Sequence, residues 1–238
     1  MEHGEEEGVL DPIIDGLIRA IHLILSGDAE VYAITRVSLF VSILGTLLSC
    51  VWSIPISATI ALRNFPGKRV LKGFFSALIG IPTVALGLYL YLLLSRSGPF
   101  GYFGLLYTPY AIIIGQCILV TPIIVSFATS ALESVDPEMR SLAKTLGASG
   151  AQTDMVVLRE AFWGVALAIL AAFNRAFAEL GVAMMLGGNI RYVTRLLTTA
   201  IALQTAMGEI ALSIALSIIL LGIVLSLNLV VSFARRRS

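Results

Sequence analysis

The sequence predicts an all-α polytopic membrane protein, and two observations carry this prediction. Of the 238 residues, 58% are apolar and only 13% are charged, and the mean hydropathy is +0.94. Soluble domains contain about 25% charged residues. A helix needs about 20 mostly apolar residues to cross the hydrocarbon core of a bilayer. Five segments reach this length, at roughly residues 37–62, 73–95, 105–130, 161–185 and 210–233.

The N-terminal region, residues 1–30, has a different character. An acidic tail covers residues 1–8, and polar residues recur at helical spacing in the segment that follows, 9–26. These polar residues are Asp11, Asp15, Arg19 and His22. Because four polar groups would be costly in a lipid-facing span, we interpret this segment as an amphipathic helix on the membrane surface. A sixth span with its polar side packed inward is the alternative. Residues 31–238 then form the transmembrane domain.

The distribution of basic residues predicts an orientation in the cell membrane. Ten of the sixteen Lys and Arg residues lie in the stretches 63–72, 140–159 and 235–237, which five spans would place on one side. The positive-inside rule assigns that side to the cytoplasm, with the C-terminus, and leaves the acidic N-terminus outside. On the outer side, residues 187–209 are too polar for a full span, and we expect them to form a short helix that dips into the membrane.

A polar island at residues 136–160 separates two long apolar segments. Asp136 can cap a helix that begins with Pro137, and Gly147 stands where a left-handed C-terminal cap belongs. The pattern predicts two short helices joined by a glycine turn, which could insert into a groove on a soluble partner. An ordinary loop packed on its own membrane domain is the alternative. The apolar residues that share one helix face are Met139, Leu142, Ala143 and Leu146.

The fourth apolar segment carries polar and charged residues near its middle, namely Asn174, Arg175 and Glu179. Ionisable groups at that depth are expected to face a bundle interior or a watery cavity and to be paired. Arg175 and Glu179 are four residues apart, so an internal ion pair that only stabilises the bundle is one interpretation. The other is that Arg175 lines a path for an anion. Thr199 adds a hydroxyl donor to the candidate path.

Several kinds of chemistry have no motif in this sequence. There is no G-x-x-x-x-G-K-[ST] phosphate loop, no H-E-x-x-H or C-x-x-C motif, and no G-x-S-x-G motif. We find no convincing pair of nucleophile and base and no basic cluster with aromatic residues. The chain is therefore not predicted to be an enzyme, to hydrolyse ATP alone, to bind a metal or another cofactor, or to contact nucleic acid.

The polar island resembles the cytoplasmic signature of ABC importer permeases, E-A-A-x-x-x-G followed about ten residues later by I-x-L-P. The E-A-A positions are Ser141, Leu142 and Ala143, the glycine is Gly147, and Leu158-Arg159 stands at L-P, so the glutamate and the proline are replaced. The run FNRAFAELGVAMMLGGNIRYVTRLLTTAI is similar to permeases of the tungstate and molybdate oxyanion group, and L-R-E-A at 158–161 favours the tungstate branch. With the five-span layout, the resemblance covers most of residues 34–235.

This resemblance implies the fold and function of a type I ABC importer permease. The expected assembly contains a second permease copy, two cytoplasmic ATP-binding subunits that use ATP and Mg, and an extracytoplasmic protein that delivers the oxyanion. Residues 139–147 would be the coupling helix, and its contacts would come from Met139, Ser141, Leu142, Ala143, Leu146 and Gly147. The substrate is expected to be tungstate, or else molybdate. A permease for sulfate or another substrate, and an ATP-independent channel or carrier, are the alternatives.

Overall fold

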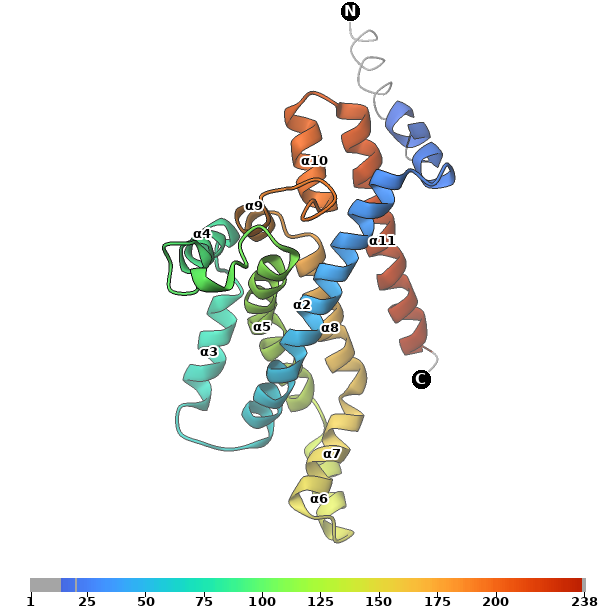
Figure 1. Ribbon diagram of the computed structural model, residues 1–238. Helices are drawn as coiled ribbons and strands as arrows, with labels where there is room; N and C mark the ends of the chain where they lie inside the picture. The colour runs from blue at the N-terminus through green and yellow to red at the C-terminus, as the bar shows by residue number, and fades with distance from the viewer. Residues whose placement is uncertain (1–13, 20, 237–238) are drawn as a thin grey trace, which may run out of the picture. The chain divides into compact units, whose positions relative to one another are not determined.

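The computed structural model describes residues 14–19 and 21–236, and this part of the chain is helical with no β-strand (Figure 1). The elements are α2 (Ala29–Leu62), α3 (Lys68–Leu78), α4 (Thr83–Leu94), the 3-10 turn η1 (Gly101–Phe103), α5 (Pro109–Glu133), α6 (Pro137–Thr145), α7 (Gly150–Glu160), α8 (Phe162–Phe177), α9 (Gly181–Gly187), α10 (Leu197–Ala206) and α11 (Ile210–Arg236).

The chain folds as two compact units. Unit 1 comprises residues 1–42, 83–115 and 177–238, and unit 2 comprises residues 43–82 and 116–176.

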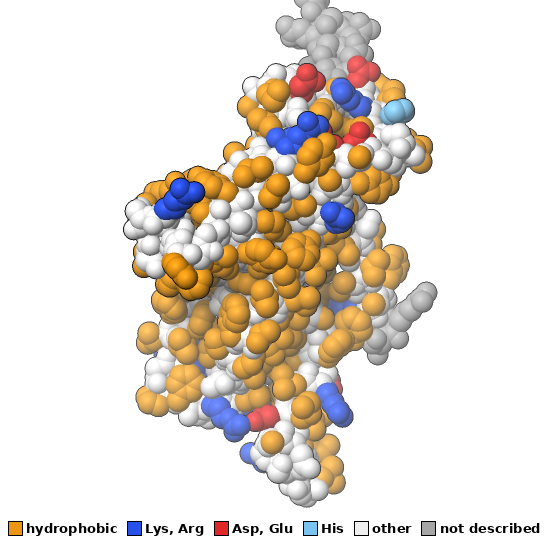
Figure 2. All heavy atoms as spheres, viewed as in Figure 1, with side chains coloured by type: hydrophobic (Ala, Val, Ile, Leu, Met, Phe, Trp, Pro, Cys, Tyr) orange, Lys and Arg blue, Asp and Glu red, His pale blue; other side chains and the backbone are white. Residues whose placement is uncertain are grey.

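Three described helices, α2, α5 and α11, are long and apolar enough to cross a membrane. The number rises to five if each of two bent helix pairs, α3 with α4 and α7 with α8, forms one span. Figure 2 shows hydrophobic side chains over much of the visible face, and many large apolar side chains of these helices are exposed. The all-α membrane fold predicted from the sequence is confirmed. The boundary predicted at residue 30 stays a prediction.

Two of the five predicted segments are interrupted rather than continuous. The segment 73–95 breaks between α3 and α4 at residues 79–82, where Pro82 has no N–H to donate and the turn closes with short bonds such as Gly80 N to Ala77 O, 3.1 Å. The segment 161–185 breaks between α8 and α9. There a carboxylate oxygen of Glu179 accepts a hydrogen bond from Val182 N at 3.0 Å. Backbone groups freed inside a membrane need such partners.

Close contacts between small residues and neighbouring helices organise unit 1. Helix α4 packs against α9, and a Cβ added at Gly181 would lie 2.7 Å from Thr83 Oγ1. A Cβ added at Gly115 in α5 would lie 2.4 Å from Val182 Cγ1. The surrounding core cluster consists of Leu90, Leu94, Ala111, Val182 and Leu186. Glycine at these positions lets the helix backbones approach one another, as is common between membrane helices.

The stretch 187–209, which is predicted to lie on the outer side, contains the predicted short helix, α10, which packs along α11 (Figure 1). Gly208 turns the chain between the two helices with a φ of +79°. At the start of α10, Leu197 N donates to Ser38 Oγ of α2 at 2.9 Å. The predicted short helix is therefore confirmed, and its depth in the membrane stays a prediction.

Residues 14–19 and 21–25, within the predicted amphipathic segment 9–26, are helical. Residues 9–13 and 20 of that segment lie outside the described part of the chain. Large apolar side chains of this helix remain exposed, at Ile14, Leu17, Ile18, Ile21 and Ile24. A row of exposed apolar side chains is the surface expected of a helix that lies in a membrane interface.

A row of serines on α2 packs against α5 in unit 2. Ser49, Ser53 and Ser57 are spaced four residues apart and are fully buried. Ser49 Oγ is 2.9 Å from Thr121 Oγ1, and Ser57 Oγ donates to Val125 O at 3.3 Å. Ser57 Oγ also donates to the carbonyl of Ser53 on its own helix at 2.7 Å. The polar atoms of this contact therefore have partners.

The close approach at Gly115 yields the first prediction. The variant Gly115→Ala is expected to lower the free energy of unfolding by about 1–3 kcal/mol, because its methyl group would overlap the stiff, buried side chain of Val182. Thermal unfolding of the purified protein in detergent measures the effect. Gly222→Ala in α11 is the matched control, because no atom lies within 4 Å of its added Cβ. Equal unfolding temperatures for the two variants would contradict this packing argument.

Candidate functional site

The polar island forms a helical hairpin, and both ends of its first helix, α6, are capped as the sequence predicts. Asp136 Oδ1 accepts a hydrogen bond from Glu138 N at 2.9 Å, and Pro137 is the first residue of α6. Gly147 has a φ of +83°, and Ala148 N donates to Ala143 O at 3.0 Å, which is the bond pattern of a Schellman motif. The two short helices and the glycine turn between them are therefore confirmed.

A capping box, which was not predicted from the sequence, begins the second helix of the hairpin. Ser149 N donates to Gln152 Oε1 at 2.7 Å, and Gln152 N donates to Ser149 Oγ at 3.4 Å. Reciprocal bonds of this kind satisfy two backbone donors that a helix start would otherwise leave unpaired. The turn between α6 and α7 is thus fixed on both sides.

The hairpin leaves large apolar side chains exposed. Leu146 is 80% exposed, Leu142 is 55% exposed and Met155 is 51% exposed. Beside them is a groove of about 540 Å³, which is lined by Leu146, Gly147, Ala148, Gln152, Met155, Val156 and Arg159. Adjacent exposed apolar side chains on an otherwise polar element are typical of a protein interaction site.

The other predicted coupling residues have different surroundings. Ala143 is buried, since it is only 7% exposed, and Met139 is half-buried. Ser141 is exposed, and its hydroxyl donates to Pro137 O at 3.3 Å within the same helix. The six predicted residues therefore lie together on α6 and the following turn, but Leu142 and Leu146 are the large side chains that face outward.

A packed cluster joins the hairpin to two long helices of unit 2. Val157 of α7 is fully buried against Ala61 of α2 and Leu132 of α5, together with Ala161. Arg63 Nη2 pairs with Asp154 Oδ2 at 2.6 Å and so connects the end of α2 to α7. Because close-packed side chains transmit strain, a displacement of the hairpin would be passed to α2 and α5.

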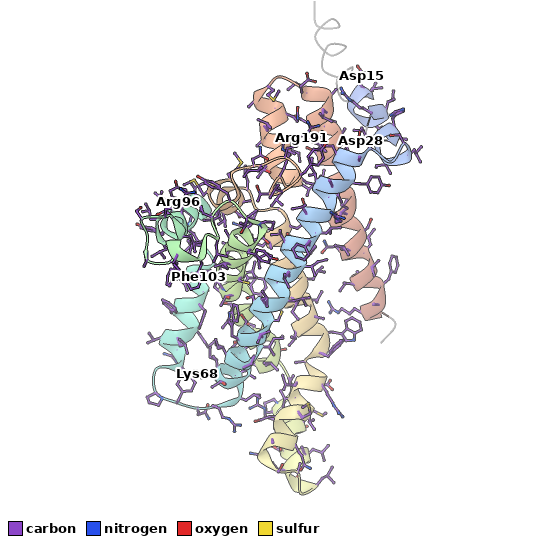
Figure 3. All side chains as sticks on the ribbon, in the orientation of Figure 1. Asp15, Asp28, Lys68, Arg96, Phe103 and Arg191 are labelled. Atoms are coloured by element: carbon purple, nitrogen blue, oxygen red, sulfur yellow. The ribbon has the colours of Figure 1, made fainter. Side chains whose placement is uncertain are left out.

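A second ionic contact lies near the same end of unit 2. Lys68 and Lys72 of α3 both bind the carboxylate of Glu133 at the end of α5, at 3.2 and 2.5 Å (Lys68 is labelled in Figure 3). These ion pairs join residues more than 60 positions apart in the chain, so no local sequence pattern reveals them. They hold α3 against the cytoplasmic end predicted for α5.

Inside the apolar part of unit 2, helices α5 and α8 carry polar side chains. Asn174 and Arg175 are half-buried in the last turns of α8. Gln116 of α5 is fully buried, and its Nε2 donates to Ala176 O at 3.0 Å. Gln116 was not predicted from the sequence, although a lone amide in an apolar segment is a signal that could have identified it.

The remaining predicted path residues, Glu179 and Thr199, lie in unit 1. Glu179 lies beyond the end of α8 at Phe177, so Arg175 and Glu179 are not on one continuous helix, and the ion pair between them stays a prediction. Its backbone carbonyl accepts a hydrogen bond from Thr198 Oγ1 at 2.8 Å, which ties it to α10. Thr199 is fully buried, and its hydroxyl bonds both N and O of Leu196 at the start of α10.

Comparison with known proteins gives similar chains over nearly the whole length. A probable anion ABC transporter permease protein of Haloferax volcanii is 42% identical over 211 residues, which cover 87% of this chain and 91% of that relative. A tungstate uptake system permease protein, TupB, of Peptoclostridium acidaminophilum is 36% identical over 222 residues, which cover 93% of this chain and 97% of the relative.

The fold also has a counterpart among solved structures. A chain of an amino acid ABC transporter, crystallised with histidines, superposes with a TM-score of 0.66 at 16% sequence identity, and the match covers 90% of this chain and 97% of that one. The family described as binding-protein-dependent transport system inner membrane component matches residues 53–238. With its helical membrane fold and its capped hairpin, this chain belongs to that family of inner membrane transport components.

Proposed function

We propose that this chain is the permease subunit of an ATP-driven importer for a tetrahedral oxyanion, with tungstate as the first candidate and molybdate as the second. The single observation that carries the proposal is the similarity to the tungstate uptake permease, which extends over 93% of this chain. The family consists of transport components, so the chain is a transport subunit rather than an enzyme. The two named oxyanions are both tetrahedral dianions, and a cationic, hydrogen-bonding path suits either.

The proposed assembly contains two copies of this permease, two cytoplasmic ATP-binding subunits and an extracytoplasmic oxyanion-binding protein. The ATP-binding subunits would bind ATP and Mg, since the sequence of this chain has no phosphate loop. The chain would cross the membrane several times, with the N-terminus outside and the C-terminus in the cytoplasm. Four basic residues between α2 and α3 and at the start of α3 support this orientation, namely Arg63, Lys68, Arg69 and Lys72.

The hairpin would couple ATP binding to transport. Leu142 and Leu146 would insert into a groove of the ATP-binding subunit, with Met139, Ser141, Ala143 and Gly147 shaping the contact. Closure of the ATP-binding pair would then move the hairpin as a body. Because Val157 is packed against α2 and α5, both helices would follow, which supports a rigid-body change between two arrangements.

The proposed path for the anion uses Asn174, Arg175, Glu179 and Thr199. Arg175 would supply the positive charge that a dianion needs inside an apolar bundle, and Asn174 would add an amide donor next to it. The buried Gln116, which bonds the carbonyl of the residue after Arg175, supports a polar surface in this part of unit 2. Glu179 and Thr199 would shape the backbone break and the start of α10 in unit 1.

Transport itself is the direct test of this proposal. Proteoliposomes that contain this chain, its ATP-binding subunit and its binding protein are expected to take up radiolabelled tungstate only when ATP is present. Unlabelled molybdate should compete more strongly than sulfate. Uptake by the permease without nucleotide would instead support the ATP-independent carrier. Failure to take up any of the three oxyanions would overturn the proposed substrate class.

The exposed side chain of Leu146 yields a prediction about assembly. Leu146→Asp is expected to weaken binding of the ATP-binding subunit by about 30-fold or more, because a central apolar contact is typically worth about 2 kcal/mol. Microscale thermophoresis with the purified subunit measures the affinity. Thr145→Asp is the matched control, since it adds the same charge one position earlier on an exposed site and removes no large apolar group. If both variants bind equally well, Leu146 does not form the contact.

The left-handed backbone at Gly147 yields a prediction about coupling. Gly147→Val is expected to reduce ATP-driven tungstate uptake at least about tenfold, because a β-branched residue at a φ of +83° costs about 1–2 kcal/mol or more and would reorient the hairpin. Membrane abundance, measured by immunoblot, should be unchanged. Gly150→Val is the control, because Gly150 is the first residue of α7 and a Cβ there meets no atom within 4 Å. Normal uptake by Gly147→Val would contradict coupling through the hairpin.

A further inference from the structure

Two arginines of unit 1 converge on one carboxylate. Arg191 donates through Nε to Glu30 Oε1 at 3.0 Å and through Nη2 to Oε2 at 2.5 Å. Arg195 Nη1 donates to the same Oε1 at 3.1 Å. Three guanidinium N–H groups therefore bind a single side chain, which lies 161 positions from Arg191 and 165 from Arg195 in the sequence. Glu30 raises the pKa of Arg191 further, so this arginine stays charged.

A fixed backbone presents these arginines. Thr194 is fully buried, and its hydroxyl accepts from Ile190 N at 2.9 Å and donates to Gly187 O at 2.5 Å. Asn189 Nδ2 donates to Thr199 O at 3.4 Å. The chain between α9 and α10 is thus bonded on both sides of Arg191, and the arginine side chains project from a supported loop. Arg191 also lies over the ring of Tyr192, with its Cζ 5.0 Å from the ring centroid.

A cavity of about 160 Å³ adjoins this cluster in unit 1, with room for several water molecules. The charged and amide groups that line it are Arg19, Asp28, Glu30, Arg195 and Gln204. The Nε of Arg195 is buried and has no hydrogen-bond partner among the described residues, which leaves a charged donor unsatisfied. An unsatisfied buried donor of this kind is costly, and an acceptor that reached it would be favoured. Figure 3 labels Asp28 and Arg191 in this region.

The chemistry of the cluster fits a tetrahedral oxyanion. The fork of an arginine side chain binds two oxygens of a carboxylate or of an oxyanion with the same geometry. Glu30 supplies one negative charge directly to two guanidinium groups, and Asp28 acts on Arg191 only at longer range, without an ion pair. A tetrahedral dianion would bring two negative charges to the same two guanidinium groups. Glu30 therefore occupies the place that two oxygens of such an anion would take.

We propose that Arg191 and Arg195 form a receiving site for a tetrahedral oxyanion and that Glu30 is an internal carboxylate which the arriving anion displaces. This inference rests on the proposed oxyanion transport and deepens it. Glu30 lies in the first turn of α2, one of the helices long enough to span the membrane. Displacement of its carboxylate would free that turn from the loop before α10. Arrival of the anion would thereby break the ion pairs that connect the first turn of α2 to the loop before α10.

Binding of tungstate to three variants tests this site without any need for transport. The full chain, co-purified with its ATP-binding subunit in lipid nanodiscs, is dialysed against tungstate, and bound tungsten is measured by mass spectrometry. Glu30→Gln is expected to bind tungstate about tenfold more tightly than the wild-type protein does. This factor follows if the Glu30 carboxylate is bound to the arginines about 90% of the time, so that only about 10% of the wild-type protein can accept the anion. Arg195→Gln is expected to lose the binding. Equal affinities for wild type and Glu30→Gln would overturn the proposal.

Asp28→Asn is the matched control for removal of a nearby negative charge. Asp28 lines the same cavity, but its Oδ1 accepts from Val31 N at 2.9 Å at the start of α2, a role that asparagine keeps. The affinity of Asp28→Asn for tungstate should differ from that of the wild type by no more than about twofold. Asp28 forms an ion pair with neither arginine of this cluster, and salt screens the effect of its charge at longer range. A gain equal to that of Glu30→Gln would mean that general charge, rather than displacement of Glu30, controls binding.

A second measurement keeps the proposal testable if a variant fails to fold. In the wild-type protein, tungstate should slow the modification of Arg191 and Arg195 by phenylglyoxal, mapped by peptide mass spectrometry, and should leave Arg63 of unit 2 unaffected. Unchanged rates at saturating tungstate would overturn the proposal. If uptake in proteoliposomes is normal while this protection is absent, the receiving site is wrong and the transport function stands. If oxyanion uptake fails as well, the proposed function itself is wrong.

Discussion

Every backbone N–H and C=O group inside a bilayer must find a partner within the protein, and this constraint explains most of the fold. Regular helices satisfy it along the lengths of α2, α5 and α11. Where a helix stops early, a side chain or a short turn supplies the missing partner. The carboxylate of Glu179 at the start of α9 and the hydroxyl of Thr194 after it are the clearest cases. Irregular backbone in unit 1 therefore occurs where polar side chains bond it.

The hairpin follows different rules because it is built from polar sequence. Its helices are too short to persist alone, and caps at Asp136, Gly147 and Ser149 define where they begin and end. The hairpin is nevertheless firmly attached, since Val157 packs into the core cluster with Ala61 and Leu132. An element with a capped, rigid turn and a packed base can transmit a push, whereas a flexible loop would absorb it. The exposed side chains of Leu142 and Leu146 are the surface on which a partner could exert such a force.

The sequence predicted the features that depend on local chemistry. Asp136 before Pro137 and the glycine at position 147 are local signals, and the structure has both caps where they were expected. The apolar segments were also found, because length and composition suffice to identify them. Their continuity was not predicted correctly. The break after α8 depends on a carboxylate that bonds a backbone N–H three residues later, and periodicity contains no information about that bond.

Contacts between distant positions were beyond the reach of sequence analysis. Gln116 meets the end of α8 across 60 positions, and Glu30 meets two arginines across more than 160. Each residue was visible as a polar group, but only the fold shows what it contacts. The candidate coupling residues lie within nine consecutive positions, so a local pattern could group them, and their role in coupling stays a prediction. The candidate path residues are spread over both units and stay predictions.

The buried serines of α2 determine which substitutions this helix can accept where it packs against α5. Ser57 bonds a carbonyl of its own helix, and the contact of the serine row with α5 depends on small volume as much as on hydroxyl groups. Alanine or glycine would fill such positions with little loss of shape. At these positions, a change that keeps the side chain small would therefore keep the spacing between α2 and α5 in unit 2.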